Sequence, residues 1–271
     1  MIKNLLKNCF NLLILFCLFN NNLFCKNLKS KKIVSKKEKN EINKPVEIKY
    51  AVFDVNGCFW RPKTKDIFNK YIENYKVSFW DKIKMGGYFV AHKLGTINVK
   101  AAYEALLSNC KGKTQEENKK STDIIWNDIC KDYIYKKSLE IFNEHRKKGV
   151  KTIIASTSPS EIYYNLLDYY KFDHLCATEL EKKDGILTGK LVGNPCAGKD
   201  KRNMVKKLIE NELKGSLKET VFYARSQLDI PLLKLVGKPV ALNPDPNLKS
   251  YAKIKGWEII EADECVSAGF N

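Results

Sequence analysis

The chain has 271 residues, of which 44% are hydrophobic and 11% aromatic, enough apolar surface to exclude a largely disordered protein. Its 48 Lys and Arg residues against 31 Asp and Glu give a formal net charge of +17, which favours anionic partners. The sequence lacks the basic, aromatic-interleaved motifs of nucleic-acid-binding modules, so we expect no nucleic acid partner.

The first 25 residues form a separate N-terminal segment. Lys3 and Lys7 precede an apolar run at 12–19, which is short for a transmembrane helix and typical of the core of a secretory signal peptide. No small-x-small cleavage site follows the run, so an uncleaved membrane anchor is the alternative. We therefore expect a protein that is exported, periplasmic or secreted, or held at a membrane by its N-terminus.

Residues 26–46 are rich in Lys, Asn, Ser and Glu and show neither helical nor strand periodicity, which indicates a linker. Because this segment is basic, a domain tethered at an anionic lipid surface is one hypothesis for the chain. We expect the remaining residues, 47–271, to form the folded domain.

The folded domain begins with a predicted strand at 46–53, which ends in the turn Asn56-Gly57. Apolar and aromatic residues then recur at helical spacing from about 64 to 137, without a strand pattern. Gly86-Gly87 and the segment 112–114 are expected to divide this helical stretch, and Thr114 to cap the helix that follows. The next predicted elements are a helix at 139–148, a strand at 150–155, a helix at 161–170, a hairpin turning at 182–185, a helix at 201–214, a strand at 220–224, a helix at 230–235, and strands at 239–242 and 257–260.

Strands that alternate with helices predict an α/β fold with a mainly parallel, Rossmann-like sheet. The helical stretch after the first strand is best placed as an inserted helical cap at about 64–137. Ligands of such sheets bind at the carboxyl ends of the strands, so we expect the functional residues there.

Polar motifs follow the predicted strands. The first strand ends in Asp54-Val-Asn56-Gly57, and the second in Ser156-Thr-Ser-Pro159. In order and spacing, they and the later segments resemble the motifs of the haloacid dehalogenase-like (HAD) superfamily, in its phosphoserine-phosphatase-like branch. The resemblance covers about residues 47–260, including the cap. The later segments that carry it are Thr178–Gly189, Cys196-Ala-Gly-Lys-Asp-Lys201, Tyr223-Ala-Arg225-Ser226-Gln-Leu-Asp229 and Val240–Asp245.

The resemblance implies hydrolysis of a phosphorylated small molecule, a phosphomonoester, through an aspartyl-phosphate. Asp54 would be the nucleophile, Ser156 would donate a hydrogen bond to the phosphate, and Lys201 would neutralise charge. Lys199 is the alternative to Lys201. The implied cofactor is Mg²⁺, with Asp54, Asn56 and Asp229 as its candidate ligands.

Two positions depart from the family pattern. Asn56 stands where the second carboxylate of the first motif protonates the leaving group and later activates water, and an amide cannot exchange a proton in this way. Arg225 stands where the fourth motif supplies an Asp for Mg²⁺, and its permanent positive charge should repel a divalent cation.

These departures leave two functional hypotheses. The first is an HAD-like phosphomonoester hydrolase of reduced activity. The alternative is a non-catalytic pseudophosphatase that binds a phosphorylated ligand or a protein partner. In both, Ser156, Lys201 and Arg225 are the expected phosphate-binding residues, because Arg225 offers a positive charge where the family has a metal ion.

Overall fold

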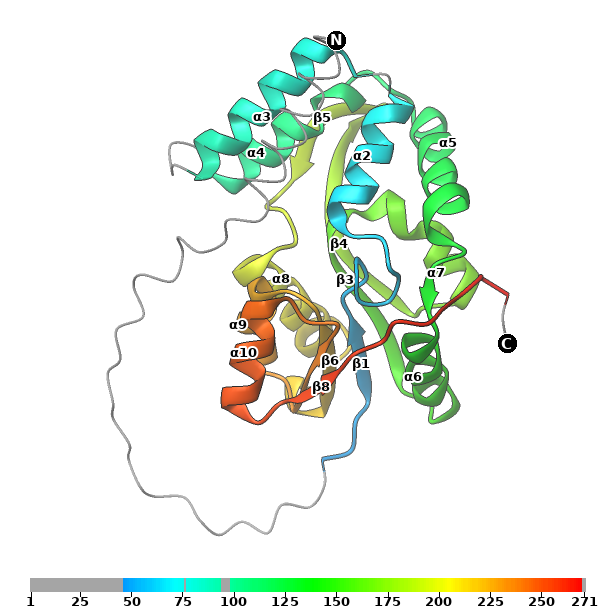
Figure 1. Cartoon of the computed structure of the whole chain (residues 1–271), viewed down its shortest axis with the longest axis vertical. Coiled ribbons are helices and arrows are strands. Elements are labelled where there is room, and N and C mark those ends of the chain that lie inside the picture. The colour runs from blue at the N-terminus through cyan, green and yellow to red at the C-terminus, as the bar shows by residue number, and fades with distance from the viewer. Residues whose placement is uncertain (1–45, 76, 94–97, 270–271) are drawn as a thin grey trace. The chain divides into compact units, whose positions relative to one another are not determined.

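The computed structural model describes residues 46–75, 77–93 and 98–269 (Figure 1). The leader predicted at 1–25 and the linker predicted at 26–46, apart from its last residue, lie outside the described residues. The chain divides into two compact units, one that includes Val77–Leu106 and one made of Val46–Lys76 with Leu107–Asn271. None of the helices within the described ranges is long and apolar enough to cross a membrane.

The first unit contains two helices that pack against each other, α3 (Phe79–Lys93) and α4 (Val99–Leu106). Ser78 Oγ accepts a hydrogen bond from the Asp81 N–H at 3.1 Å, which satisfies a backbone donor at the start of α3. Gly86 and Gly87 lie inside α3, so the predicted break at these glycines is wrong. A glycine within a helix costs only about 1 kcal/mol relative to alanine, which packing against a neighbouring helix offsets.

The second unit is built on a seven-stranded sheet with the strand order β5-β4-β3-β1-β6-β7-β8. At its centre, β1 (Tyr50–Phe53) pairs in parallel with β3 (Lys151–Pro159) and β6 (Thr220–Ala224). Parallel pairing continues through β7 (Lys238–Leu242) and β8 (Glu258–Ile260) on one side and β4 (His174–Lys183) on the other. The predicted α/β fold with a mainly parallel, Rossmann-like sheet is confirmed.

The edge strand β5 (Ile186–Val192) runs antiparallel to β4 and forms the predicted hairpin. Its two-residue turn is Asp184-Gly185, and both residues have positive φ, the conformation that such tight turns require. The prediction missed the first part of β4, which pairs with β3 before it enters the hairpin. These few residues, His174–Cys176, are too short a run to show an alternating pattern.

Helices cover both faces of the sheet (Figure 1). On one face lie α8 (Gly198–Lys206), α9 (Ile230–Leu233) and α10 (Pro246–Lys255), and on the other lies α6 (Lys136–Lys147). Residues alternate along each strand, so Tyr50 and Val52 of β1 join the apolar cluster beneath α8–α10. Other members of that cluster are Ile153, Ala155, Phe222, Ala224, Val205, Leu232, Leu233 and Leu248.

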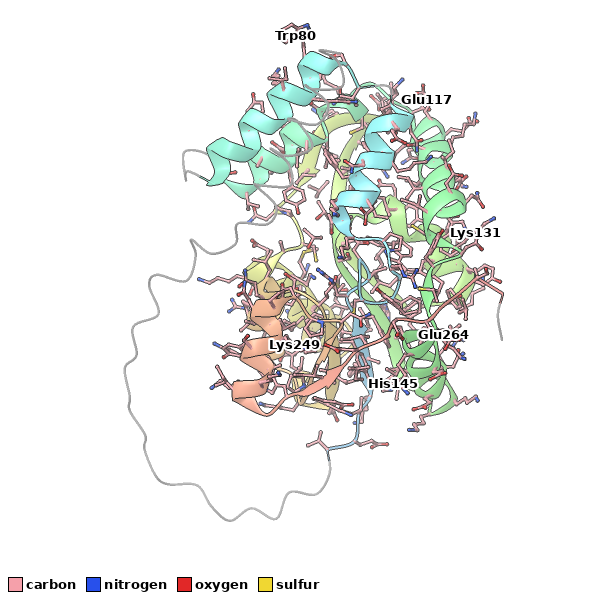
Figure 2. The ribbon with its side chains drawn as sticks, in the orientation of Figure 1. Trp80, Glu117, Lys131, His145, Lys249 and Glu264 are labelled. Atoms are coloured by element: carbon pink, nitrogen blue, oxygen red, sulfur yellow. The ribbon has the colours of Figure 1, made fainter. Side chains whose placement is uncertain are left out.

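An aromatic cluster fills the opposite face. Phe53 of β1 stacks on Tyr223 of β6 with ring centroids 4.8 Å apart, and its edge meets Phe142 of α6. His145, also on α6 and labelled in Figure 2, places Nε2 2.8 Å from the Tyr223 hydroxyl. Each fully buried aromatic side chain contributes about 1.5–3 kcal/mol, so this cluster fixes the central strands against α6.

The second unit also contains α2 (Thr64–Asn74), α5 (Gln115–Ile125), α7 (Tyr164–Tyr170) and a two-stranded sheet of β2 (Ile134–Tyr135) with β9 (Cys265–Val266). Thr114 caps α5 as predicted: Thr114 Oγ1 accepts from the Glu117 N–H, and Glu117 Oε2, on the side chain labelled in Figure 2, accepts from the Thr114 N–H. β2 was not predicted, because two residues are too few to show a period. Nor was α10, although Asp245, Pro246 and Gly256 are typical start and stop signals.

Candidate active site at the carboxyl ends of the central strands

Asp54 follows directly on β1, the central strand, at its carboxyl end. Its backbone N–H donates to the Tyr223 carbonyl of β6 at 2.9 Å, so parallel pairing continues one residue past the strand. The residue is 7% exposed, and one carboxylate oxygen, Oδ1, lies 3.4 Å from Lys201 Nζ. The strand end thus holds a nearly buried carboxylate next to a cation.

Lys201 links two carboxylates. It projects from α8, is 2% exposed, and places Nζ 2.7 Å from Asp229 Oδ1 as well as near Asp54. Burial alone would lower the pKa of Lys201, but the charges of Asp229 and Asp54 raise it above its ordinary value. Lys201 therefore stays charged at neutral pH. Lys199, the alternative in the sequence, is exposed.

Asp229 ends the 3₁₀ turn η7 (Gln227–Asp229) and is 1% exposed. Burial raises the pKa of its carboxyl to about 6; Lys201 opposes this shift and Asp54 adds to it. Asp229 Oδ2 has no hydrogen-bond partner among the described residues. The carboxylate is therefore held in place by Lys201, and its charge depends on that contact.

The side chain of Asn56 is held by three neighbours. Its Nδ2 donates to Ser158 Oγ at 2.9 Å and to Thr64 Oγ1 at 3.2 Å, and its Oδ1 accepts from Trp60 Nε1 at 2.9 Å. Both amide hydrogens are used, so Asn56 has neither an acidic proton nor a free donor for a reacting group. Trp60 and Thr64 were missed by sequence reasoning, because nothing in their spacing marks them as partners of Asn56.

Ser156 lies within β3, is 1% exposed, and places Oγ 2.6 Å from the Tyr163 hydroxyl. Tyr163 is buried against Trp60, with ring centroids 5.7 Å apart, and burial raises the pKa of its phenol. Ser156 and Asn56 therefore belong to adjoining parts of one buried polar group. A tyrosine within an apolar helical pattern is expected to be a core residue, so the sequence did not indicate Tyr163 as part of the site.

Arg225 follows β6 and lies across the loop that carries Asp54. An added Cβ at Gly57, whose φ is +71°, would be 2.7 Å from Arg225 Cδ and 2.8 Å from Nε, so the arginine stem passes directly over this glycine. Asp245 fixes the backbone: its N–H donates to the Arg225 carbonyl at 2.8 Å, and its Oδ2 accepts from the Gln227 N–H at 2.9 Å. In the described part of the chain, no carboxylate pairs with the half-buried Arg225 guanidinium.

The donor atoms present do not fit Mg²⁺, which prefers an octahedron of oxygen ligands. Asp54 and Asp229 each place one oxygen near Lys201, and Asn56 Oδ1 accepts from Trp60. The charges of Asp54, Asp229, Lys201 and Arg225 sum to zero, so the cluster has no net negative charge to attract a divalent cation. No group of three or more His, Cys, Asp or Glu suited to a metal ion occurs among the described residues.

The structure thus brings Asp54, Lys201 and Asp229 into direct contact and joins Asn56 to Ser156 through Trp60 and Tyr163. The model of one protein family, described as haloacid dehalogenase-like hydrolase, matches residues 51–234. The chain belongs to this family. The match begins within β1 and ends just beyond α9, so it includes all seven of these site residues and Arg225.

Curated proteins similar to this chain include two whose names are those of phosphatases. Phosphoserine phosphatase SerB1 of Mycobacterium tuberculosis is 32% identical over 163 residues, which are 60% of this chain and 52% of the relative. A histidinol-phosphatase of Neisseria meningitidis is 32% identical over 123 residues, 44% of this chain and 55% of the relative. The chain spans about half the length of the curated relatives it matches.

Solved structures share the HAD fold. A protein of unknown function from Bordetella pertussis superposes with a TM-score of 0.71 at 20% identity, covering 79% of this chain and 98% of that protein. A phosphoserine phosphatase, solved as an analogue of its phospho-aspartyl intermediate, superposes with a TM-score of 0.56 at 17% identity, covering 79% and 93%. At such identities, the likeness supports the fold alone.

Proposed function

We propose that the chain is an HAD-family phosphatase that transfers the phosphoryl group of a phosphorylated small molecule to Asp54 and releases it slowly as inorganic phosphate. The observation that carries the proposal is the contact of 3.4 Å between Asp54 Oδ1 and Lys201 Nζ at the end of the central strand. The relatives named phosphoserine phosphatase and histidinol-phosphatase support a phosphomonoester as the substrate class.

In the first step, an Asp54 oxygen attacks phosphorus and the bond from phosphorus to the leaving oxygen breaks. Lys201 keeps its charge at neutral pH and stabilises the negative charge on the phosphoryl oxygens. When Tyr163 donates its proton to Ser156 Oγ across their contact of 2.6 Å, the Ser156 hydrogen is free to donate to the phosphate. The leaving group takes its proton from solvent, because Asn56 has none to give.

In the second step, water attacks phosphorus, phosphate leaves, and Asp54 is regenerated. A general base normally removes the proton of that water, a contribution of about 10²- to 10⁴-fold to the rate. Asn56 cannot act as a base, so the proton passes to solvent and this step is slow. We therefore expect the phosphorylated form of Asp54 to accumulate.

No step of this mechanism is assigned to Mg²⁺, because the donor set does not fit it. The guanidinium of Arg225 instead supplies positive charge at the position where the family pattern has a carboxylate. Arginine binds phosphate through two parallel N–H donors, so it suits a phosphoryl group better than a single point charge. Its lack of a carboxylate partner within the described residues leaves its donors for a ligand.

A second candidate function follows from the same residues. A domain that holds a phosphorylated ligand without turning it over needs Lys201, Arg225 and Ser156 but no proton exchange. The three hydrogen bonds of the Asn56 amide favour this function, because they leave Asp54 as the only side chain of the first motif that could take part in catalysis.

Release of inorganic phosphate from phosphoserine, histidinol phosphate and acetyl phosphate tests the proposal, with the full chain and an Asp54→Asn variant compared in EDTA and in Mg²⁺. We expect slow release in EDTA that is lost in the variant. Phosphate binding by a folded chain without any release would support the non-catalytic candidate. Equal release by the chain and the variant would show that Asp54 is not the nucleophile.

A further inference from the structure

Within the described residues, the side chains around Asp54 include no general acid for a leaving group. Asn56 uses both amide hydrogens on Ser158 and Thr64. The Lys201 ammonium is held by the Asp229 and Asp54 carboxylates at 2.7 Å and 3.4 Å, and a guanidinium such as that of Arg225 does not act as a general acid. Asp229 is 1% exposed, and its Oδ1 lies 2.7 Å from Lys201 Nζ, so it serves as the ionised partner of that cation.

No histidine with a described side chain can act as the general acid for the leaving group. His145 lies on α6 and contacts the Tyr223 hydroxyl, and His174 is the first residue of β4. His174 pairs with Ile153 of β3, so strand β3 lies between it and the strand that carries Asp54. His145 is influenced by Lys238, which starts β7, so it lies toward the amino ends of the strands, away from Asp54. Neither of the two histidines whose side chains the structure describes is therefore within reach of a group bound at Asp54.

We infer that this site takes phosphates whose leaving group departs as a stable anion, such as acyl, aryl or enol phosphates, and discriminates against alkyl phosphates. The inference rests on the proposed function and names the substrate class of the same site. A carboxylic acid has a pKa of about 4 and a phenol one of about 10, whereas an alcohol is about as weak an acid as water. Only the alkoxide needs a general acid to leave, and general acid catalysis supplies about 10²- to 10⁴-fold.

The transfer balances without a co-reactant. One Asp54 oxygen forms a bond to phosphorus as the bond to the leaving oxygen breaks, and the electron pair stays on that oxygen. A carboxylate or phenolate leaves unprotonated and takes no proton from the protein. This step needs no proton from Asn56, so the three hydrogen bonds that hold its amide do not slow it. The proposed substrate class therefore agrees with the geometry at position 56.

The test is the dependence of kcat/KM on the leaving group, measured for the full chain with acetyl phosphate, 4-nitrophenyl phosphate, phenyl phosphate and phosphoserine. Because kcat/KM reports the first transfer, slow hydrolysis of phosphorylated Asp54 does not mask the result. Asn56→Asp is the informative variant: Trp60 Nε1 can still donate to the new carboxylate, and the Ser158 and Thr64 hydroxyls can turn to donate as well. Asn127→Asp, at an exposed site, is the matched control.

We expect kcat/KM of the wild type to fall steeply from acetyl phosphate to phosphoserine. Asn56→Asp should raise kcat/KM by about 10²- to 10⁴-fold for phosphoserine and by less than about tenfold for acetyl phosphate. Turnover that depends on Asp54 but varies little with the leaving group would overturn the inference and leave the proposed function standing. Absence of turnover with all four compounds would overturn both.

Discussion

Replacement of Lys201 by methionine is a severe test of the cluster at the strand ends. The lysine side chain is 2% exposed and lies 2.7 Å from Asp229 and 3.4 Å from Asp54. Methionine keeps much of the apolar stem and removes the charge. Asp229, itself 2% exposed at its side chain, would then be a buried carboxylate without a compensating cation.

The expected loss in the free energy of unfolding at pH 7 is about 3–5 kcal/mol, the usual cost when one partner of a buried ion pair is removed. The loss should depend on pH. The pKa of Asp229 is already raised to about 6, and without Lys201 it rises further. Between pH 7 and pH 6 Asp229 is protonated in the folded variant but only partly protonated in the folded wild type, so the loss should shrink by about 1 kcal/mol.

Urea denaturation at pH 7 and pH 6 measures both effects. The matched control is Lys199→Met, two residues away and exposed, which should change stability by less than about 0.5 kcal/mol. A second variant, Lys201→Met with Asp229→Leu, removes both buried charges and should recover most of the loss. A loss below about 1 kcal/mol for Lys201→Met, or one that is equal at the two pH values, would refute the reasoning.

Three further predictions follow from contacts in the same unit. Gly57→Ala should lower the free energy of unfolding by about 1–2 kcal/mol, because φ at this position is +71°. It should also weaken the binding of inorganic phosphate, measured by calorimetry, because the new Cβ would lie 2.7 Å from Arg225 Cδ; unchanged binding would show that Arg225 does not bind phosphate. His145→Gln should make the free energy of unfolding less sensitive to acid. Burial, Lys148 and Lys238 lower the pKa of His145 below 6.5 in the folded chain, so the wild type loses stability as the pH falls through 6.5. An unchanged dependence of the free energy of unfolding on pH in the variant would contradict this. The double variant Asn56→Asp with Arg225→Asp should release phosphate only with Mg²⁺, and equal release in EDTA would show that position 225 does not decide metal use.

Most residues of the candidate site could be predicted from the sequence, because they follow predicted strands and occur in the order of the family motifs. Asp54, Ser156 and Asp229 could be placed at one edge of the sheet because parallel strands present their carboxyl ends together. Lys201 could be identified only through the resemblance, since in a chain with this many lysines spacing alone does not mark one for burial. Its contacts with both carboxylates give that choice a physical basis.

The partners of the site could not be predicted, because they depend on side-chain packing across segments far apart in the sequence. Asn56 and Ser158 are 102 positions apart and share a hydrogen bond of 2.9 Å. Gly57 reads as a turn residue, whereas the structure adds a second reason for glycine, the arginine stem that passes over it. Gly86 and Gly87 show the opposite error, since both lie inside a continuous helix.

The most direct test of the central claim, phosphoryl transfer to Asp54, is the mass of the intact chain after mixing with acetyl phosphate. The wild type should gain the mass of one phosphoryl group, located on Asp54 by peptide mapping, because the first transfer needs no general acid and the second step lacks a base. Asp54→Asn should gain none, and Asn56→Asp should carry less label, because it hydrolyses the intermediate faster. A wild type that stays unlabelled while releasing phosphate, or that carries the label elsewhere, would contradict the account.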